Sequence, residues 1–322
     1  MQSRAFTAVR VAVTLAIVGG LIYRLSPGEL SDVFTDSDPL LMLAAVALMI
    51  VVQALVVVKW MVLMRARDVV LPLPRALRCY CLGSLLNNVL PTAVGGDVYR
   101  IYRVQRETTA RAADVAMTVL YERATGYAAM TCLGCLGAAF YYGHALWGLL
   151  ALAGGGVAAV LLLYVVPRAP FPAMPMDHFL RNLLAHRREG LAVYRMTVFS
   201  LVIQALYIST IVLAGRALGI DVSWWYWAFA TWLVALALLV PATLGGLGVR
   251  EGGYSALIDS AGGTAAQGAS AGFALGLLLI VSNLIGLALV EGYDRYFAHD
   301  APLDESEIAD AERALSTPAR TR

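Results

Sequence analysis

The sequence has few charged residues. Only 14% of its 322 residues are Asp, Glu, Lys or Arg, whereas 60% are hydrophobic, and the mean hydropathy is +0.71. Soluble globular domains carry about 25% charged residues, so this composition excludes that class. A stretch of about 20 apolar residues crosses a bilayer. The several long uncharged runs therefore predict an all-α polytopic membrane protein.

Lysine is almost absent. Lys59 is the only one, so nearly every positive charge is a guanidinium. Guanidinium groups suit two-pronged contacts with phosphates and carboxylates, although a genomic preference for arginine codons accounts for the same excess. The net charge of +2 predicts no nucleic-acid partner. Lys59 falls near the end of an apolar run, so we expect its amine to extend toward the lipid headgroups and to have no function.

Cysteine and histidine are scarce, with four of each. Cys132 and Cys135 form a CxxC pair inside an apolar run without other cysteines or histidines nearby, which favours packing over metal binding. The sequence contains no recognisable Ser–His–Asp arrangement and no nucleotide-binding loop. We therefore predict no enzyme activity, no cofactor and no metal site. Transport, if coupled, would draw on an ion gradient or the membrane potential.

One pattern occurs twice. The segments PTAVGGDVYR (91–100) and PATLGGLGVR (241–250) both read Pro-x-x-x-Gly-Gly-x-x-x-Arg, at an offset of 150 residues. Proline ends or kinks a helix, and paired glycines permit positive φ and close backbone approach. We interpret the two copies as equivalent parts of a duplicated membrane protein that face one central site.

Six apolar runs have the length of membrane spans. They lie at about residues 9–25, 40–64, 112–142, 145–166, 196–218 and 268–292. The first motif follows a shorter apolar stretch and has arginines on both sides. Because positive flanks stay cytoplasmic, this stretch is expected to enter and leave on one side as a re-entrant hairpin. The second motif predicts another hairpin, over about residues 224–261.

Counting crossings from a cytoplasmic N-terminus makes the two halves opposite in orientation. We predict one transmembrane domain over residues 1–297, built as an inverted repeat of about 40–142 and 190–292 with two opposed re-entrant hairpins. Residues 298–322 are expected to form a disordered cytoplasmic tail. Interrupted helices at matching positions of two inverted halves are typical of a transporter with its substrate site at the midplane.

The motif arginines are the first candidates for substrate contact. If a half-helix begins after the glycines, its free N–H groups attract an anion, and Arg100 and Arg250 can each add a charge-assisted fork to a phosphate. Asp97 and Glu251 would act as counter-charges that fold these arginines inward when the site is empty. The alternative interpretation is that the Gly-Gly pairs serve close helix packing.

Two further charges fall inside the third span. Glu122 and Arg123 are costly at membrane depth and are expected to face the interior of the bundle. Glu122 is expected to meet a hairpin arginine, and Arg123 either the substrate or Asp97. The alternative is a later start of this span, which would leave both at the interface. Three polar residues are expected to form interhelical hydrogen bonds: Gln53, Gln204 and Asn283.

The segments NNVLPTAVGGDVYRIY (87–102) and PATLGGLGVRE (241–251), together with Glu122-Arg123 and Gly126, resemble the membrane region of lysylphosphatidylglycerol synthases. Stand-alone members of that family are called flippase-like membrane proteins, so the resemblance implies translocation of a lipid. The synthases carry a soluble aminoacyl-transferring domain. This sequence ends about 30 residues after its last span, so we expect neither aminoacylation nor lysylphosphatidylglycerol as the substrate.

The prediction is therefore a lipid translocase of the bacterial inner membrane, with both termini cytoplasmic. It moves an anionic or modified-headgroup lipid between leaflets. Its substrate-binding candidates are Asn87, Asn88, Gly95, Gly96, Asp97, Arg100, Glu122, Arg123, Gly245, Gly246, Arg250 and Glu251. The alternatives are a membrane enzyme of a polyprenyl-phosphate glycolipid pathway and a non-catalytic partner of a glycosyltransferase or lipid synthase.

Overall fold

The computed structural model describes residues 33–89, 95–143, 187–239 and 246–299. These ranges are helical with short connections and contain no strand. The helices are α3 (Pro39–Arg65), α4 (Leu73–Val89), α5 (Gly95–Glu107), α6 (Ala112–Tyr142), α9 (Arg187–Ala217), α10 (Trp224–Leu238), α11 (Val249–Ser260) and α12 (Ala265–His299). The predicted spans at 9–25 and 145–166, the predicted tail and most of each motif loop lie outside the described residues.

Local sequence explains where several helices begin. Asp38 caps α3 by accepting hydrogen bonds from the N–H groups of Leu40 and Leu41, at 2.8 and 3.2 Å, and proline follows at the first helical position. Ser223 caps α10 in the same way. At the start of α12, Thr264 and Gln267 exchange reciprocal side-chain-to-backbone hydrogen bonds.

Three described helical segments are long and apolar enough to cross a membrane: Pro39–Arg65, Arg195–Ala217 and Ala265–Tyr293. They coincide closely with three of the predicted spans. Helix α6 has the predicted bounds and spans 31 residues, but it is not among these three, because charged and polar residues lower its mean hydropathy.

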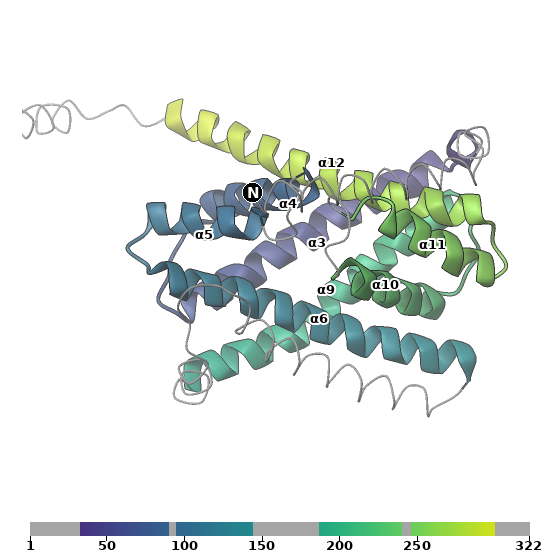
Figure 1. Ribbon diagram of the computed structural model, residues 1–322. Helices are drawn as coiled ribbons and strands as arrows, with labels where there is room; N and C mark the ends of the chain where they lie inside the picture. Colours follow the sequence, from purple (N-terminus) through teal and green to yellow (C-terminus); the bar gives the residue numbers. More distant parts are fainter. Residues whose placement is uncertain (1–32, 90–94, 144–186, 240–245, 300–322) are drawn as a thin grey trace, which may run out of the picture.

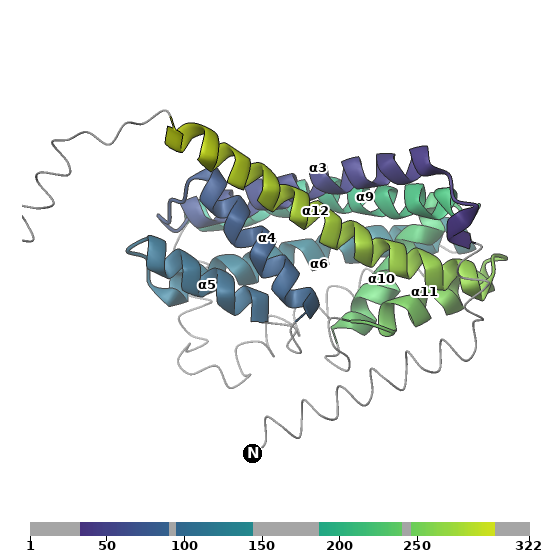
Figure 2. The same cartoon turned by 90° about the horizontal axis from the view of Figure 1, so that it is seen from above.

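The long helices α3, α6, α9 and α12 form the body of the bundle, with the pairs α4–α5 and α10–α11 toward opposite ends (Figures 1 and 2). Helices α3 and α9 are antiparallel. The N–H of Asp38 donates to the carbonyl of Ala217 at one end, and the amine of Lys59 donates to the hydroxyl of Ser200 toward the other.

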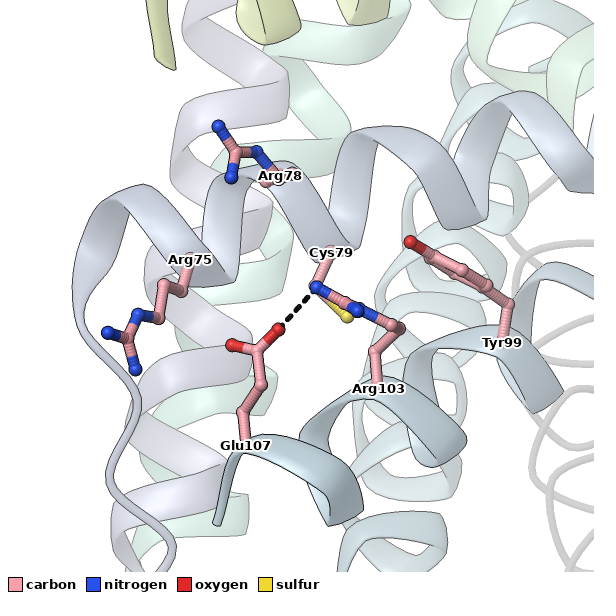
Figure 3. Close-up of a pocket in the computed structure, with 6 residues that line it drawn as sticks. All are labelled: Arg75, Arg78, Cys79, Tyr99, Arg103 and Glu107. Atoms are coloured by element: carbon pink, nitrogen blue, oxygen red, sulfur yellow. Dashed lines mark hydrogen bonds and ion pairs between the residues drawn. The ribbon is translucent and has the colours of Figure 1, made fainter. Parts of the chain in front are cut away.

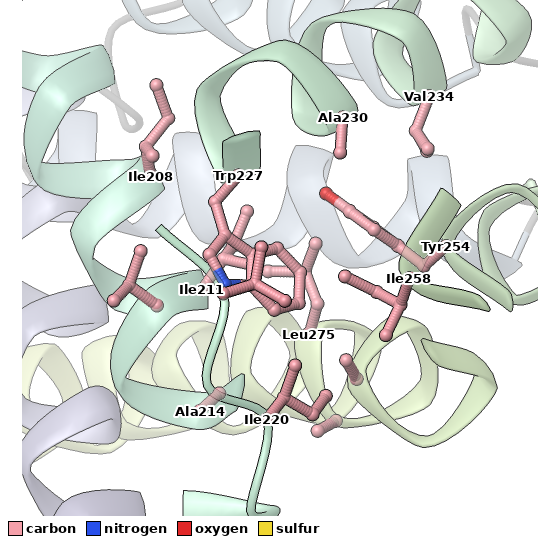
Figure 4. Packing of buried hydrophobic residues seen from close by; sticks show 14 of the residues in the cluster. Ile208, Ile211, Ala214, Ile220, Trp227, Ala230, Val234, Tyr254, Ile258 and Leu275 are labelled. Atoms are coloured by element: carbon pink, nitrogen blue, oxygen red, sulfur yellow. The ribbon is translucent and has the colours of Figure 1, made fainter. Parts of the chain in front are cut away.

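The two largest of four apolar clusters among the described residues account for most of the contacts between these helices. The larger joins α9, α10, α11 and α12 around the fully buried Trp227, with Ile211, Ile258 and Leu275 among its neighbours (Figure 4). The smaller joins α3, α4, α5 and α6 around Trp60. Large side chains such as those of Leu43 and Leu289 are exposed on the outside, each at 64%. That apolar exterior suits contact with lipid tails.

Candidate functional site

A cluster of five charged side chains lies where α5 and α6 meet α3. We call it the first-copy cluster, and its members are Lys59, Asp97, Arg100, Glu122 and Arg123. Asp97 and Arg100 stand one turn apart on α5 and so face the same neighbours. Glu122 and Arg123 are adjacent on α6 and point about 100° apart, so each meets a different residue of α5.

Arg100 is held from several sides. Its Nη1 lies 2.8 Å from Oε2 of Glu122, and the two side chains are 4% and 10% exposed. Its guanidinium carbon lies 4.1 Å from the ring centre of Trp60 and 4.5 Å from that of Tyr80. Thr118 accepts a hydrogen bond from the indole N–H of Trp60 and orients that ring. Cation–π contacts and an ion pair together fix this arginine inside the bundle.

Arg123 makes the most complete ion pair of the cluster. Its Nε and Nη2 donate to the two carboxylate oxygens of Asp97, at 2.8 and 2.9 Å. Asp97 is 8% exposed, whereas the Arg123 side chain is 39% exposed. Asp97 also lies 3.6 Å from Arg100 and therefore has a second cation within reach. Arg123 is thus the motif-linked cation that a ligand can approach.

Lys59 does not extend to the headgroups, and that prediction is wrong. It is 2% exposed, and its amine donates to the Glu122 carbonyl at 2.9 Å and to the Ser200 hydroxyl at 3.1 Å. Helices α6 and α9 cover this end of α3, so the amine is retained in the interior. The first-copy cluster therefore contains three cations and two anions, a net charge of +1.

The glycines of the first copy are explained by packing. A Cβ atom on Gly96 would overlap the Gly83 carbonyl, so α4 and α5 can cross this closely only without one. The N–H of Gly96 also donates to Oδ1 of Asn87 at 2.8 Å. Gly95 is the first residue of α5. The side chain of Asn88 is outside the described part of the structure.

The second copy is arranged differently. Arg250 donates through Nε and Nη2 to Oε1 of its neighbour Glu251, at 3.2 and 2.9 Å. The other oxygen of Glu251 accepts the N–H of Gly248 at 2.6 Å, which caps α11. Gly246 and Gly248 have φ values of +76° and +83°, so here the glycine-rich turn precedes the helix. Gly245 lies outside the described residues.

The predicted partners can now be compared with the observed ones. Glu122 meets the motif arginine Arg100, Arg123 meets Asp97, and Arg250 binds Glu251, which are the contacts expected of these side chains. Arg100 is paired with Glu122 rather than with Asp97 at the shortest distance. Two interhelical hydrogen bonds are confirmed, from Gln204 to the Gly126 carbonyl and from Asn283 to Ser84.

Sequence reasoning missed part of the site. The amide nitrogen of Gln53 is buried and makes no hydrogen bond in the described structure, contrary to expectation. The aromatic pair around Arg100, Trp60 and Tyr80, was not predicted. The one available signal was that the single lysine stands next to Trp60 in an otherwise apolar run.

The arrangement offers cations rather than metal ligands. Within the described ranges no three His, Cys, Asp or Glu side chains gather at one point. A cluster with a net charge of +1 that includes the partly exposed, bidentate Arg123 suits an oxyanion such as a phosphate, which presents two oxygens as the Asp97 carboxylate does.

Comparison with known proteins agrees with this picture of a membrane protein. A UPF0104 membrane protein of Methanothermobacter thermautotrophicus is 25% identical over 162 residues, which are 49% of this chain and 47% of that protein. The chain thus spans about half the length of this relative. The family model described as lysylphosphatidylglycerol synthase TM region matches residues 7–286. Since that match covers most of the sequence, the chain belongs to the lysylphosphatidylglycerol synthase transmembrane-region family.

Proposed function

We propose that this protein translocates a lipid with an anionic or modified headgroup between membrane leaflets. The observation that carries the proposal is the first-copy cluster, five charged side chains with a net charge of +1, four of them buried, in an otherwise apolar helical bundle. Charged residues at membrane depth are costly and usually mark a substrate or ion pathway. The proposed activity breaks no bond and needs no catalytic residue.

The positions of the helices support an inverted repeat as the framework. Shifted by 150 residues, the bounds of α3 become 189–215, and α9 spans 187–217. The same shift moves α4 to 223–239, and α10 spans 224–238. Since α3 and α9 are antiparallel, the two halves have opposite directions. That relation is the one expected of inverted-repeat transporters.

Contacts between the halves support the same framework. Helix α4 of the first half packs on α12 of the second, where Asn283 donates to Ser84 at 3.0 Å. Helix α10 of the second half packs on α6 of the first, where Trp232 donates to Thr131 at 3.2 Å. Shifting the first pair by 150 gives positions 234 and 133, two residues from the second pair. Under this proposal α4–α5 and α10–α11 are the two re-entrant hairpins.

The cluster suggests how a headgroup is accepted. A phosphate diester carries one negative charge, which would neutralise the net charge of +1. It can replace the Asp97 carboxylate on Arg123, because both present two oxygens to the same guanidinium fork. Asp97 then keeps Arg100 as its partner, 3.6 Å away before any movement. Asp97 and Glu122 would then share Arg100, so neither carboxylate loses every cation partner, which limits the desolvation cost of the exchange.

The two motif arginines take supporting roles in this proposal. Arg100 and Arg250 are 3% and 8% exposed and are already bound to carboxylates. We propose that they hold the hairpins in place and are reached only when the carboxylates release them. The protein would lie in a bacterial inner membrane, with both termini cytoplasmic and the acyl chains remaining in the bilayer during transfer.

The test is lipid exchange between leaflets in proteoliposomes. Fluorescent phosphatidylglycerol and phosphatidylcholine are compared for the wild type, Arg123→Gln and a matched control, Phe273→Leu, at the position that corresponds to Arg123 in the second half. We expect Arg123→Gln to slow phosphatidylglycerol exchange at least tenfold, because one charge-assisted fork is lost. The control should exchange at the wild-type rate.

Equal rates for Arg123→Gln and the control would overturn the assigned site. Absence of exchange above protein-free liposomes for every lipid, with or without an imposed potential, would overturn the translocase proposal. That outcome would favour the role of a partner subunit in a cell-envelope lipid pathway, and co-purification of a glycosyltransferase or lipid synthase would then support it.

A further inference from the structure

A second cationic region lies outside the first-copy cluster. A cavity of about 240 Å³ opens between α4 and α5 (Figure 3). It is lined by Arg75, Arg78, Cys79, Tyr99, Arg103 and Glu107. The proposed translocation step assigns no role to these side chains. They lie on α4 and α5, the helices that flank the loop of the first motif.

Helical spacing builds this cavity. Arg75, Arg78 and Cys79 are three and four residues apart and share one face of α4. Tyr99, Arg103 and Glu107 are spaced by four and share one face of α5. The helices touch closely where Gly83 meets Gly96. Nearer the start of α4, long side chains occupy the facing surfaces and leave an opening between them (Figure 3).

The lining is positively charged. Three arginines and one glutamate line it, a net charge of +2, of which the ion pair of Arg78 with Glu291 offsets one unit. Arg103 binds Glu107 at 2.6 Å, and Arg78 binds Glu291 of α12 at 3.2 Å. Arg75 is exposed and makes no ion pair among the described residues. Burial raises the pKa of the Cys79 thiol to about 11, on a helix that is not one of the candidate spans, so the thiol stays neutral.

A neighbouring cavity offers a contrast. It has a volume of about 490 Å³ and shares Glu107 with the first. Its charged lining is two arginines against three acids, a net charge of −1: Arg67, Arg111, Asp68, Glu107 and Asp114. An anion would therefore prefer the smaller cavity, although both lie beside the same end of α5.

We propose that the cavity between α4 and α5 binds the phosphate of an anionic lipid headgroup before the lipid reaches the first-copy cluster. Its volume equals that of roughly eight water molecules in the liquid, enough for a phosphate and a small alcohol but not for acyl chains. Apolar side chains on the same helices are exposed for lipid contact, with Leu73 at 46% and Val98 at 53%.

One residue that lines the cavity also contacts the backbone of a cluster residue. The thiol of Cys79 donates to the carbonyl of Arg100 at 3.7 Å, and Arg103 follows Arg100 by about one turn. A headgroup held by Arg75 and Arg103 therefore lies next to the buried cations. The lipid class in this inference rests on the proposed function, but binding at the cavity is measured without transport.

The experiment is calorimetric titration of the full-length protein in micelles of an uncharged detergent. The probes are dihexanoyl phosphatidylglycerol, dihexanoyl phosphatidylcholine and inorganic phosphate. The variants are the double substitution Arg75→Gln/Arg103→Gln, the single substitution Glu107→Gln, and the control Arg106→Gln on the exposed side of α5. Size-exclusion profiles and helical circular dichroism confirm that each variant is folded.

Wild type is expected to bind phosphatidylglycerol at least tenfold more tightly than the other two probes. The double substitution should weaken this binding at least tenfold, because two charge-assisted contacts are lost. Glu107→Gln should strengthen it about threefold or more, since Arg103 is freed and the net charge rises. Arg106→Gln should match the wild type.

Equal binding by the double variant and the Arg106→Gln control would overturn the proposal. Equal affinity for inorganic phosphate and phosphatidylglycerol would reassign the cavity to soluble anions and overturn the lipid assignment. Cavity binding as expected, together with failure of leaflet exchange, would remove the proposed function and leave the binding site standing.

Discussion

In the first copy of the motif, Arg100 lies among charged side chains from α3, α5 and α6 and between two aromatic rings. In the second copy, Arg250 binds Glu251, the next residue on the same helix. The first arrangement has a net charge of +1 and the second is neutral. Both copies of the motif therefore carry the arginine, but its surroundings differ between them.

The sequence explains this difference position by position. At an offset of 150 residues, Gly272 stands where the first half has Glu122, and Phe273 where it has Arg123. A Cβ atom on Gly272 would lie 2.9 Å from the Cα of Glu251, so α11 and α12 pack backbone to backbone. One half thus uses this helix face for charge and the other uses it for close packing. Under the proposed function, anion binding is therefore concentrated in the first copy of the motif.

The largest loss of stability is expected from removing the Glu122 carboxylate, which has no counterpart at the matching position, Gly272. Glu122→Leu removes the shortest ion pair of the buried Arg100. The guanidinium then has Asp97, which lies 3.6 Å away and is already bound to Arg123, so the variant should lower the free energy of unfolding by about 3 kcal/mol. Denaturant unfolding in uncharged micelles measures this. The double variant Arg100→Met/Glu122→Leu should be more stable than the single variant, because the buried guanidinium that lost its closest carboxylate is also removed. A double variant less stable than Glu122→Leu would contradict the proposed role of this ion pair.

A smaller loss of stability should distinguish a glycine needed for close helix packing, Gly96, from one needed for its positive φ, Gly246. Gly96→Ala places a methyl group against the Gly83 backbone and should cost about 2 kcal/mol through separation of α4 from α5. Gly246→Ala meets only the end of the Leu238 side chain but has φ of +76°, and should cost about 1 kcal/mol. Gly292→Ala, with no neighbour within 4 Å, is the control and should stabilise α12 slightly. The same unfolding measurement ranks them, and a larger loss for Gly246→Ala than for Gly96→Ala would reverse the comparison.

The smallest effect concerns the loop contact of the first copy. Asn87 accepts the N–H of Gly96, whereas the matching position in the second half is Ala237. Asn87→Ala should cost about 1 kcal/mol, the usual value of one such hydrogen bond. Asn87→Asp keeps the accepting oxygen and serves as the control. Equal stability of the alanine variant and the wild type would show that the hydrogen bond from Gly96 to Asn87 contributes nothing, and the two copies would then not differ in this respect.

Much of the fold could be predicted from the sequence because apolar length is a strong signal. The helix starts near residues 40 and 112 follow from where charge and proline stop, whereas α9 begins at Arg187, before the span predicted from residue 196. The ion pairs of Glu122 and Arg123 were partly predictable, since buried charges must find opposite charges. By contrast, the position of Lys59 depends on how α3 is rotated about its axis. A helix that is apolar on all sides gives no sign of which face meets α6, and so neither Lys59 nor the ring of Trp60 could be assigned a partner.

The burial of Lys59 has a chemical consequence. Apart from a chain terminus, its side chain carries the single primary amine of this sequence, and that amine is enclosed where α3, α6 and α9 meet. An amine-directed acylating reagent therefore has one side-chain target, which becomes reactive only when these three helices separate. The rate of that acylation therefore reports how often the bundle opens. Mass spectrometry can measure it without any engineered label.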